Sequence, residues 1–340
     1  AGGLALLIGI LLLKFAGASF TISHWLAADD QIRQHALYPA IFTAVLLGAM
    51  TKSAQFPFHF WLPNAMSAPT PVSAFLHAAT MVKAGVYLLM RFQPLLGGTQ
   101  LWMTTLVIIG GITALWGAIQ ALAPSDLKRV LAYTTMMALG IMTMFLGGQA
   151  TPALTAATTF LLVHALYKAS LFLAVGSIDH QTGTRQLDRL GGLWRAMPLT
   201  TVAVAAATMS MAGFPLFFGF IGKEIMYKGA LTETVYPVFA TTAALISNAL
   251  MTGVAGTILL GVFFGGRPGA LSAVREVPWT MRFGPSIMGG LTILFGIIPW
   301  WISTNLVQPA VLAFHPAREE IQLKLFHGFN TPLLLSIITL

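Results

Sequence analysis

Long apolar runs separated by short polar stretches are the dominant pattern of this chain. An apolar helix of about 20 residues is long enough to cross the hydrocarbon core of a bilayer. Ten segments of the 340-residue chain fit this description. They lie at roughly 2–18, 36–53, 70–91, 100–122, 128–147, 151–178, 197–223, 235–264, 283–303 and 330–340. We expect helices throughout, because lipid offers no hydrogen-bond partners to open backbone.

The composition agrees with this pattern. Hydrophobic residues make up 56% of the chain and Asp, Glu, Lys and Arg together only 8%, whereas soluble domains average about 25% charged residues. So few charges cannot cover a water-facing surface, so we expect one all-α membrane domain over residues 1–340. Because the chain begins at Ala1 inside one apolar run and ends inside another, we also expect it to be part of a longer membrane protein.

The net charge of +8 would suggest a nucleic-acid partner in a soluble protein. Here the basic residues gather at helix ends and in loops, so we expect a lipid bilayer and no nucleic acid. Counting spans places the basic loops 124–129, 179–196 and 265–282 on one side of the membrane. The positive-inside rule puts that side in the cytoplasm.

Two lysines stand beside predicted helix breaks. Lys52 ends an apolar run just before Phe56-Pro57, and Lys223 follows the sequence Gly213-Phe214-Pro215. A charge in a low-dielectric interior costs several kcal/mol unless it is paired, hydrated or neutralised. Such a lysine beside opened backbone indicates an ion-transport site. The alternative is a lysine at a helix end that extends its stem to the membrane surface.

Five further cationic or titratable residues lie within the apolar spans. His164 and Lys168 are four positions apart and therefore share a helix face. Two steps of a hydrated proton relay fit this spacing, since histidine titrates near neutrality; a polar contact that locks two helices is the alternative. His77 and Lys83 are six positions apart and do not share a face of an intact helix, although Gly85 could loosen the segment. For them the alternatives are a hydrogen-bonded core histidine and a structural ion pair.

Lys128 opens the span 128–147 just after Asp126, a good N-cap residue. It either anchors the helix start at the membrane surface or reaches inward toward the relay. The chain has no cysteine, no HExxH, no P-loop and no carboxylate dyad. We therefore expect no metal, no cofactor and no bond-breaking chemistry.

Three sequence blocks resemble a known family. Residues 51–91 read TKSAQFPFHFWLPNAMSAPTPVSAFLHAATMVKAGVYLLMR, 126–135 read DLKRVLAYTT and 164–173 read HALYKASLFL. In this order they are similar to the antiporter-like family shared by Mrp-type multisubunit Na+/H+ antiporters and the proton-pumping membrane subunits of respiratory complex I. The blocks LDRLGGLWRAMPLT (187–200), Lys223-Glu224 and LKLFHGFNTPLLLS (323–336) favour the large A subunit of the Mrp antiporter.

The resemblance implies two inverted repeats, each with a broken helix. The rest of the first repeat would occupy about 1–91, the second about 100–264, and additional helices about 283–340. Lys52 and Lys223 match the two broken-helix lysines, and His77, Lys83, Lys128, His164 and Lys168 match the polar axis or positions beside it. The family's first-repeat lysine pairs with a glutamate on a helix that would precede Ala1.

The resemblance further implies a transporter subunit in the bacterial cytoplasmic membrane that exchanges Na+ for H+ beside other membrane subunits. Two alternatives stay open at this point. One is a proton-pumping subunit of an NADH:quinone oxidoreductase, and the other is a scaffold whose polar axis only holds helices together.

Overall fold

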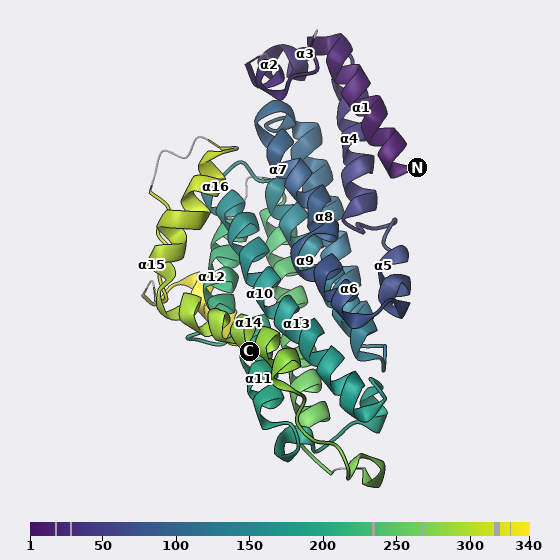
Figure 1. Ribbon diagram of the computed structural model, residues 1–340. Coiled ribbons are helices and arrows are strands. Elements are labelled where there is room, and N and C mark those ends of the chain that lie inside the picture. Colours follow the sequence, from purple (N-terminus) through teal and green to yellow (C-terminus); the bar gives the residue numbers. More distant parts are fainter. Residues whose placement is uncertain (18, 28, 233–234, 267, 316–319, 327) are drawn as a thin grey trace.

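The structure is a computed structural model that describes residues 1–340 apart from 18, 28, 233–234, 267, 316–319 and 327. Within this part of the chain every regular element is helical, in agreement with the predicted all-α class. Figure 1 shows an elongated bundle with α1 and α4 on one flank and α14 to α16 on the other.

The amino-terminal third contains one pair of apolar helices and several short ones. α1 packs against α4, and two short helices connect them. The helices are α1 (Gly2–Gly17), α2 (Ile22–Ala27), α3 (Asp29–Gln34), α4 (Tyr38–Lys52), α5 (Trp61–Asn64), α6 (Thr70–Ala74) and α7 (Ala84–Leu96). Between α6 and α7 the chain forms a π-turn at Phe75–Ala79 and a 3₁₀ turn at Met81–Lys83.

The middle and the carboxyl-terminal parts hold the longest helices. These are α8 (Gln100–Gln120), α9 (Leu127–Leu146), α10 (Thr151–Thr182), α11 (Pro198–Ala212), α12 (Phe218–Leu231), α13 (Pro237–Phe263), α14 (Trp279–Ile297), α15 (Pro299–Ile302), α16 (Gln308–Leu312) and α17 (Thr331–Ile338). α10 lies among α9, α11, α12 and α14 and has the site residues on its middle turns. α9 is the central helix, with 89% of its most apolar window buried.

The number of spans differs from the expectation of about ten. In the described residues, five helices are long and apolar enough to cross a membrane, or six if one bent pair counts as a span. α4, α11 and α12 have 15, 15 and 14 residues and are too short by this criterion. The expected span 197–223 is divided by the turn between α11 and α12.

The bent pair is a feature that the hydrophobic pattern did not predict. α14 and the helical segment that follows it, Pro299–Leu312, meet at 96° at a break within the expected span 283–303. Proline has no N–H for the helix ladder and disfavours helical backbone in the residue before it. Accordingly Ile298, which precedes Pro299, leaves the helical region with φ −115° and ψ 54°.

α8 and α9 pack closely because small residues face each other. A Cβ atom added to Gly110 would lie 2.3 Å from the backbone nitrogen of Met144, and one added to Gly140 would lie 2.4 Å from that of Ala114. Small residues at a helix interface let two backbones approach in membranes, where water does not drive the helices together. This contact fixes α9, the helix that bears Lys128 and the partners of Lys168.

We predict that Gly110→Ala destabilises the bundle by about 1–3 kcal/mol, because the added methyl group overpacks the α8–α9 contact. Thermal unfolding of the purified full-length protein in detergent measures the effect. Gly253→Ala is the matched control, since Gly253 is exposed on α13 and its added Cβ would meet nothing within 4 Å. Equal unfolding temperatures for the two variants would contradict the close packing.

Candidate functional site

His164 and Lys168 point into the bundle from α10. Both side chains are 0% exposed, which agrees with their predicted shared face. The Lys168 ammonium donates to the carbonyl oxygen of Leu131 at 2.9 Å and to the hydroxyl of Thr134, both on α9. It also lies 5.9 Å from the centre of the Tyr167 ring. α9 therefore supplies the oxygens that hold this amine.

His77 and Lys83 are both buried even though six positions separate them. The segment between α6 and α7 is irregular, and Thr80 has the non-helical angles φ −126° and ψ −84°. This change of direction allows His77 (0% exposed) and Lys83 (4% exposed) to turn inward together. The Lys83 ammonium donates to the carbonyl of Ala78 and, at 3.1 Å, to that of Leu161 on α10.

The predicted role of Gly85 in loosening this segment is wrong. Gly85 lies in the regular part of α7, where an added Cβ would be 2.2 Å from the Ala49 carbonyl oxygen of α4. Its small size serves helix packing, and the irregularity lies before it.

These four side chains, His77, Lys83, His164 and Lys168, form the central cluster. His164 lies within electrostatic range of the other three, and His77 within range of Lys168. The imidazole of His77 also packs against Phe172, with ring centres 4.9 Å apart. Within the described residues, the ring nitrogens of both histidines are buried without a hydrogen-bond partner.

Lys223 caps the end of α11. Its ammonium donates to the carbonyl of Ala212 at 3.0 Å, and the residue is 2% exposed. The last carbonyls of a helix have no partner inside the helix and interact well with a cation. The hydroxyl of Thr252 on α13 lies 3.4 Å from the same oxygen, within reach as an alternative donor. The turn at Gly213, with φ +77°, places α12 so that Lys223 reaches this oxygen.

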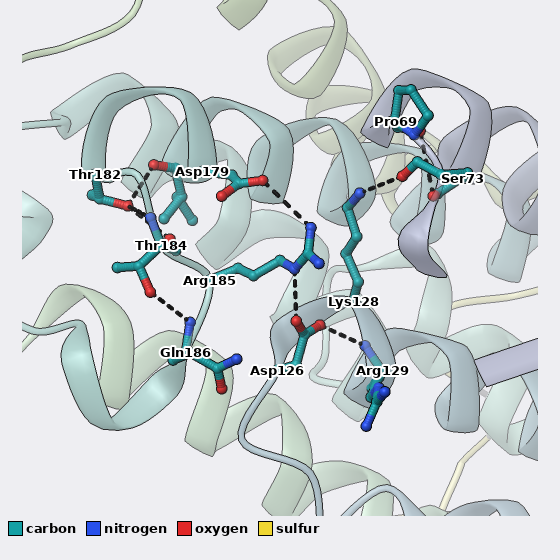
Figure 2. Close-up of polar contacts among 12 residues, drawn as sticks. Pro69, Ser73, Asp126, Lys128, Arg129, Asp179, Thr182, Thr184, Arg185 and Gln186 are labelled. Atoms are coloured by element: carbon teal, nitrogen blue, oxygen red, sulfur yellow. Dashed lines mark hydrogen bonds and ion pairs between the residues drawn. The ribbon is translucent and has the colours of Figure 1, made fainter. Parts of the chain in front are cut away.

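Lys128 lies at the opposite kind of helix end, in the first turn of α9. Asp126 caps the helix by accepting from the backbone N–H of Arg129 at 3.1 Å. The Lys128 side chain is 1% exposed, and its amine donates to the carbonyl of Ala68 at 2.8 Å. Figure 2 shows it beside the turn that contains Pro69 and Ser73. The amine therefore turns toward this neighbouring segment.

Lys52 differs from the other predicted lysines. It is the last residue of α4 and is exposed, so the expectation that it is buried is wrong. The reason is the position of α4, whose described neighbours are chiefly α1 and α7. The next residue, Ser53, connects the end of α4 to the irregular segment: its hydroxyl donates to the Val82 carbonyl at 2.6 Å and accepts from the Val86 N–H at 3.0 Å.

The hydrogen bonds of the four buried lysines all go to neutral oxygens. They run from Lys83, Lys128, Lys168 and Lys223 to backbone carbonyls and one threonine hydroxyl. Among the described residues no group of three or more His, Cys, Asp or Glu side chains is arranged to hold a metal ion. A buried ammonium held by neutral oxygens alone is costly; for Lys128, the carboxylates of Asp126 and Asp179 act on its charge and offset part of this cost.

Three contributors were missed from the sequence. Thr134, Ser53 and Arg185 all contact the site or its surroundings. Thr134 had a signal, since a hydroxyl in the apolar run after Lys128 has to find a partner. Nothing local marked Ser53, whose hydroxyl binds the Val82 carbonyl 29 residues along the chain. Arg185 pairs with the nearby Asp179 and with Asp126, 59 residues before it, and the second pairing depends on the tertiary fold.

The structure is a bundle of apolar helices with lysines and histidines buried in its interior, an arrangement typical of membrane proteins with a functional polar site. Over residues 1–250 the chain matches the family described as NADH:quinone oxidoreductase/Mrp antiporter, TM, and it belongs to this family.

Two bacterial relatives place the chain more closely. It is 42% identical over 344 residues to the A/B subunit of a probable K(+)/H(+) antiporter of Rhizobium meliloti, with all of this chain and 34% of the relative covered. It is 35% identical over 364 residues to the A1 subunit of the Na(+)/H(+) antiporter of Staphylococcus aureus strain Newman, with all of this chain and 45% of the relative covered.

Among solved structures, the chain is similar to one in the Mrp complex from Dietzia sp. DQ12-45-1b. The TM-score is 0.89 at 34% identity, with 99% of this chain and 37% of the other covered. The chain thus spans less than half the length of the relatives it matches.

We predict that Gly213→Ala is more destabilising than Gly183→Ala. Both glycines have left-handed backbone, with φ +77° and +67°, where a side chain costs about 1–2 kcal/mol. The Cβ at 213 would also lie 2.5 Å from Cδ of Lys223, whereas the one at 183 would meet nothing within 4 Å. Thermal unfolding of the full-length assembly compares them. If Gly183→Ala lowers the unfolding temperature as much, Lys223 does not lie against this turn.

Proposed function

We propose that the chain is part of the membrane core of a multisubunit monovalent cation/proton antiporter, in the bacterial cytoplasmic membrane. The observation that carries this proposal is the central cluster, in which two amines with only neutral hydrogen-bond acceptors and two imidazoles are buried within electrostatic range of one another. A cluster built only for structure would be more stable with apolar side chains of similar size.

Protons move through the site by mutual electrostatic influence. When Lys168 is protonated, a second proton on His164 or Lys83 becomes more costly, because like charges in a poorly hydrated interior repel strongly. Loss of that proton reverses the effect. The buried ring nitrogens of His77 and His164 support a hydrated route, since buried polar atoms in proteins are generally satisfied, and water satisfies those that the protein does not.

Lys128 and Lys223 give the route two ends. Lys128 lies at the start of α9, at the end of the molecule where the basic loops gather. Lys223 lies on α12, which packs along α10: a Cβ on Gly222 would touch the side chain of Val163, the neighbour of His164, at 3.0 Å. The direction of travel is from Lys128, through the central cluster, to Lys223.

Movement of the second ion, the alkali cation, is coupled to the proton by electrostatic repulsion. A protonated lysine disfavours a nearby alkali cation and a neutral one permits it, so proton entry and cation exit alternate. The relatives' names include both Na(+) and K(+), and we assign Na+ as the exchanged cation, with other membrane subunits as partners. Those names describe antiporters, which favours exchange over a redox-driven pump of the oxidoreductase type.

We predict that Lys168→Met, Lys223→Ala and Lys52→Ala each abolish cation/proton exchange in the full assembly. The physical reason is the loss of one proton carrier, or, for Lys52, of a charge at the break after α4. The measurement is cation-induced pH change in inverted vesicles, with Na+ and K+ tested in parallel. Assembly is checked by co-purification of the partner subunits.

The matched control is Lys228→Ala, which removes an exposed lysine on the same helix as Lys223. It should exchange ions at the wild-type rate. If Lys168→Met loses only thermal stability and keeps full exchange, the cluster is a scaffold and the proposal fails. Full exchange by Lys223→Ala or Lys52→Ala removes that residue alone from the route.

A further inference from the structure

The segment after α10 is tied across the beginning of α9. The N–H of Leu127 donates to the carbonyl of Arg185 at 3.0 Å, and the N–H of Leu187 donates to that of Ser125 at 2.8 Å. Together they form the bridge between Asp126 and Gln186. Figure 2 shows this segment running beside the first turn of α9. Residues 183–187 therefore cover the helix end where Lys128 is buried.

Arg185 connects the segment to two carboxylates from different helices. Its Nε lies 2.6 Å from Oδ2 of Asp126, at the start of α9, and its Nη1 lies 3.6 Å from Oδ2 of Asp179, in the last turn of α10 (Figure 2). All three side chains are partly exposed, at 31%, 14% and 33%. Ion pairs with this much solvent contact are individually weak, so the guanidinium can leave the two carboxylates without unfolding the helices.

Lys128 lies directly behind the Arg185 ion pairs. Its charge interacts with those of Arg185, Asp179 and Asp126, yet the residue is only 1% exposed. In the first turn of a helix such burial needs a cover, and the described residues supply the turn with Ala68 and the segment 183–187. The cover over this amine is therefore thin.

Two hollows lie on either side of the Arg185 ion pairs. One of about 540 Å³ has Ser67, Asp126 and Arg185 among its lining residues. The other, of about 660 Å³, is lined in part by Thr70, Asp179 and His180. Each hollow therefore has one of the two carboxylates in its wall, and Arg185 joins the two walls in front of Lys128.

We propose that Arg185 is a gating residue that controls the access of water to Lys128. Its two ion pairs reinforce the two backbone hydrogen bonds that hold the segment 183–187 over the amine, and release of the guanidinium opens a path from the hollows to the amine. The transport meaning of this gate rests on the proposed function, because Lys128 is the route's end on this side. The closed geometry itself does not depend on that function.

The test uses a thiol as a probe of access, since the chain has no cysteine of its own. Ser73→Cys places the probe on α6 at a position 2% exposed, whose hydroxyl contacts the carbonyl of Pro69, the residue after Ala68. The full assembly in inverted vesicles is treated with a membrane-impermeant maleimide, and modification of the residue-73 peptide is followed by mass spectrometry.

We expect Arg185→Ala to accelerate labelling of Ser73→Cys about tenfold, which corresponds to about 1.4 kcal/mol in the closing equilibrium. Asp179→Asn, which breaks half of the bridge, should act in the same direction and serves if Arg185→Ala does not fold. Arg189→Ala, at an exposed position in the same loop, should leave the rate unchanged. Unchanged labelling in both bridge variants would overturn the proposal.

Two further probes separate gating from loosening of the fold. Ser67→Cys is exposed and should react quickly with or without Arg185. Ser247→Cys is fully buried on α13 and should stay unreactive; if Arg185→Ala accelerates it as well, the bundle has loosened and the gate is refuted. The labelling needs no transport, so an active Lys168→Met variant would remove the proposed function and leave this result intact.

Discussion

An ammonium group inside a helical bundle has to find oxygen atoms, and regular helices offer few, because their carbonyls are already used in the i to i+4 ladder. Three of the four buried lysines bind carbonyls where the ladder is interrupted. Lys223 uses the end of α11, Lys83 the π-turn between α6 and α7, and Lys128 the turn before α6. The irregular backbone thus determines where cations can be held.

Rigid and irregular parts are combined in one small volume. α8 and α9 approach through small residues and form a closely packed wall, which fixes the oxygens of Leu131 and Thr134 that hold Lys168. On the other side of the cluster, the segment with His77 and Lys83 leaves helical geometry. Changes in hydrogen bonding are therefore less costly there than in α9.

Local pattern predicted much of this arrangement, and long-range contacts account for the rest. The apolar runs located the helices, and the spacing of His164 and Lys168 predicted their common face, since both features depend on neighbours within one helix. The burial of Lys52, the role of Gly85 and the 96° bend at Ile298 were not predicted correctly. The burial of Lys52 and the role of Gly85 depend on which helices pack against α4. The bend arises because Pro299 interrupts the helix within an apolar run that by itself predicts one continuous span.

The partners of the buried amines could not be read from the sequence for the same reason. Lys83 and the Leu161 carbonyl are 78 residues apart, and Lys168 and the Leu131 carbonyl are 37 apart. These contacts form through tertiary packing, which the hydrophobic periodicity of a single helix does not predict.

The shared acceptor at Ala212 has a kinetic consequence. Lys223 donates to this carbonyl at 3.0 Å, while the Thr252 hydroxyl, which has one proton, lies 3.4 Å from it and 2.7 Å from the Thr339 carbonyl, its closer acceptor. When the Lys223 amine moves away, the Thr252 hydroxyl can donate to the Ala212 carbonyl in its place. The buried oxygen therefore keeps a hydrogen-bond donor throughout. An exchange of donors lowers the activation barrier relative to breaking a lone bond. Substituting Thr252 would therefore slow the release of the Lys223 amine from the Ala212 carbonyl, while leaving the hydrogen-bonded position of the amine unaltered.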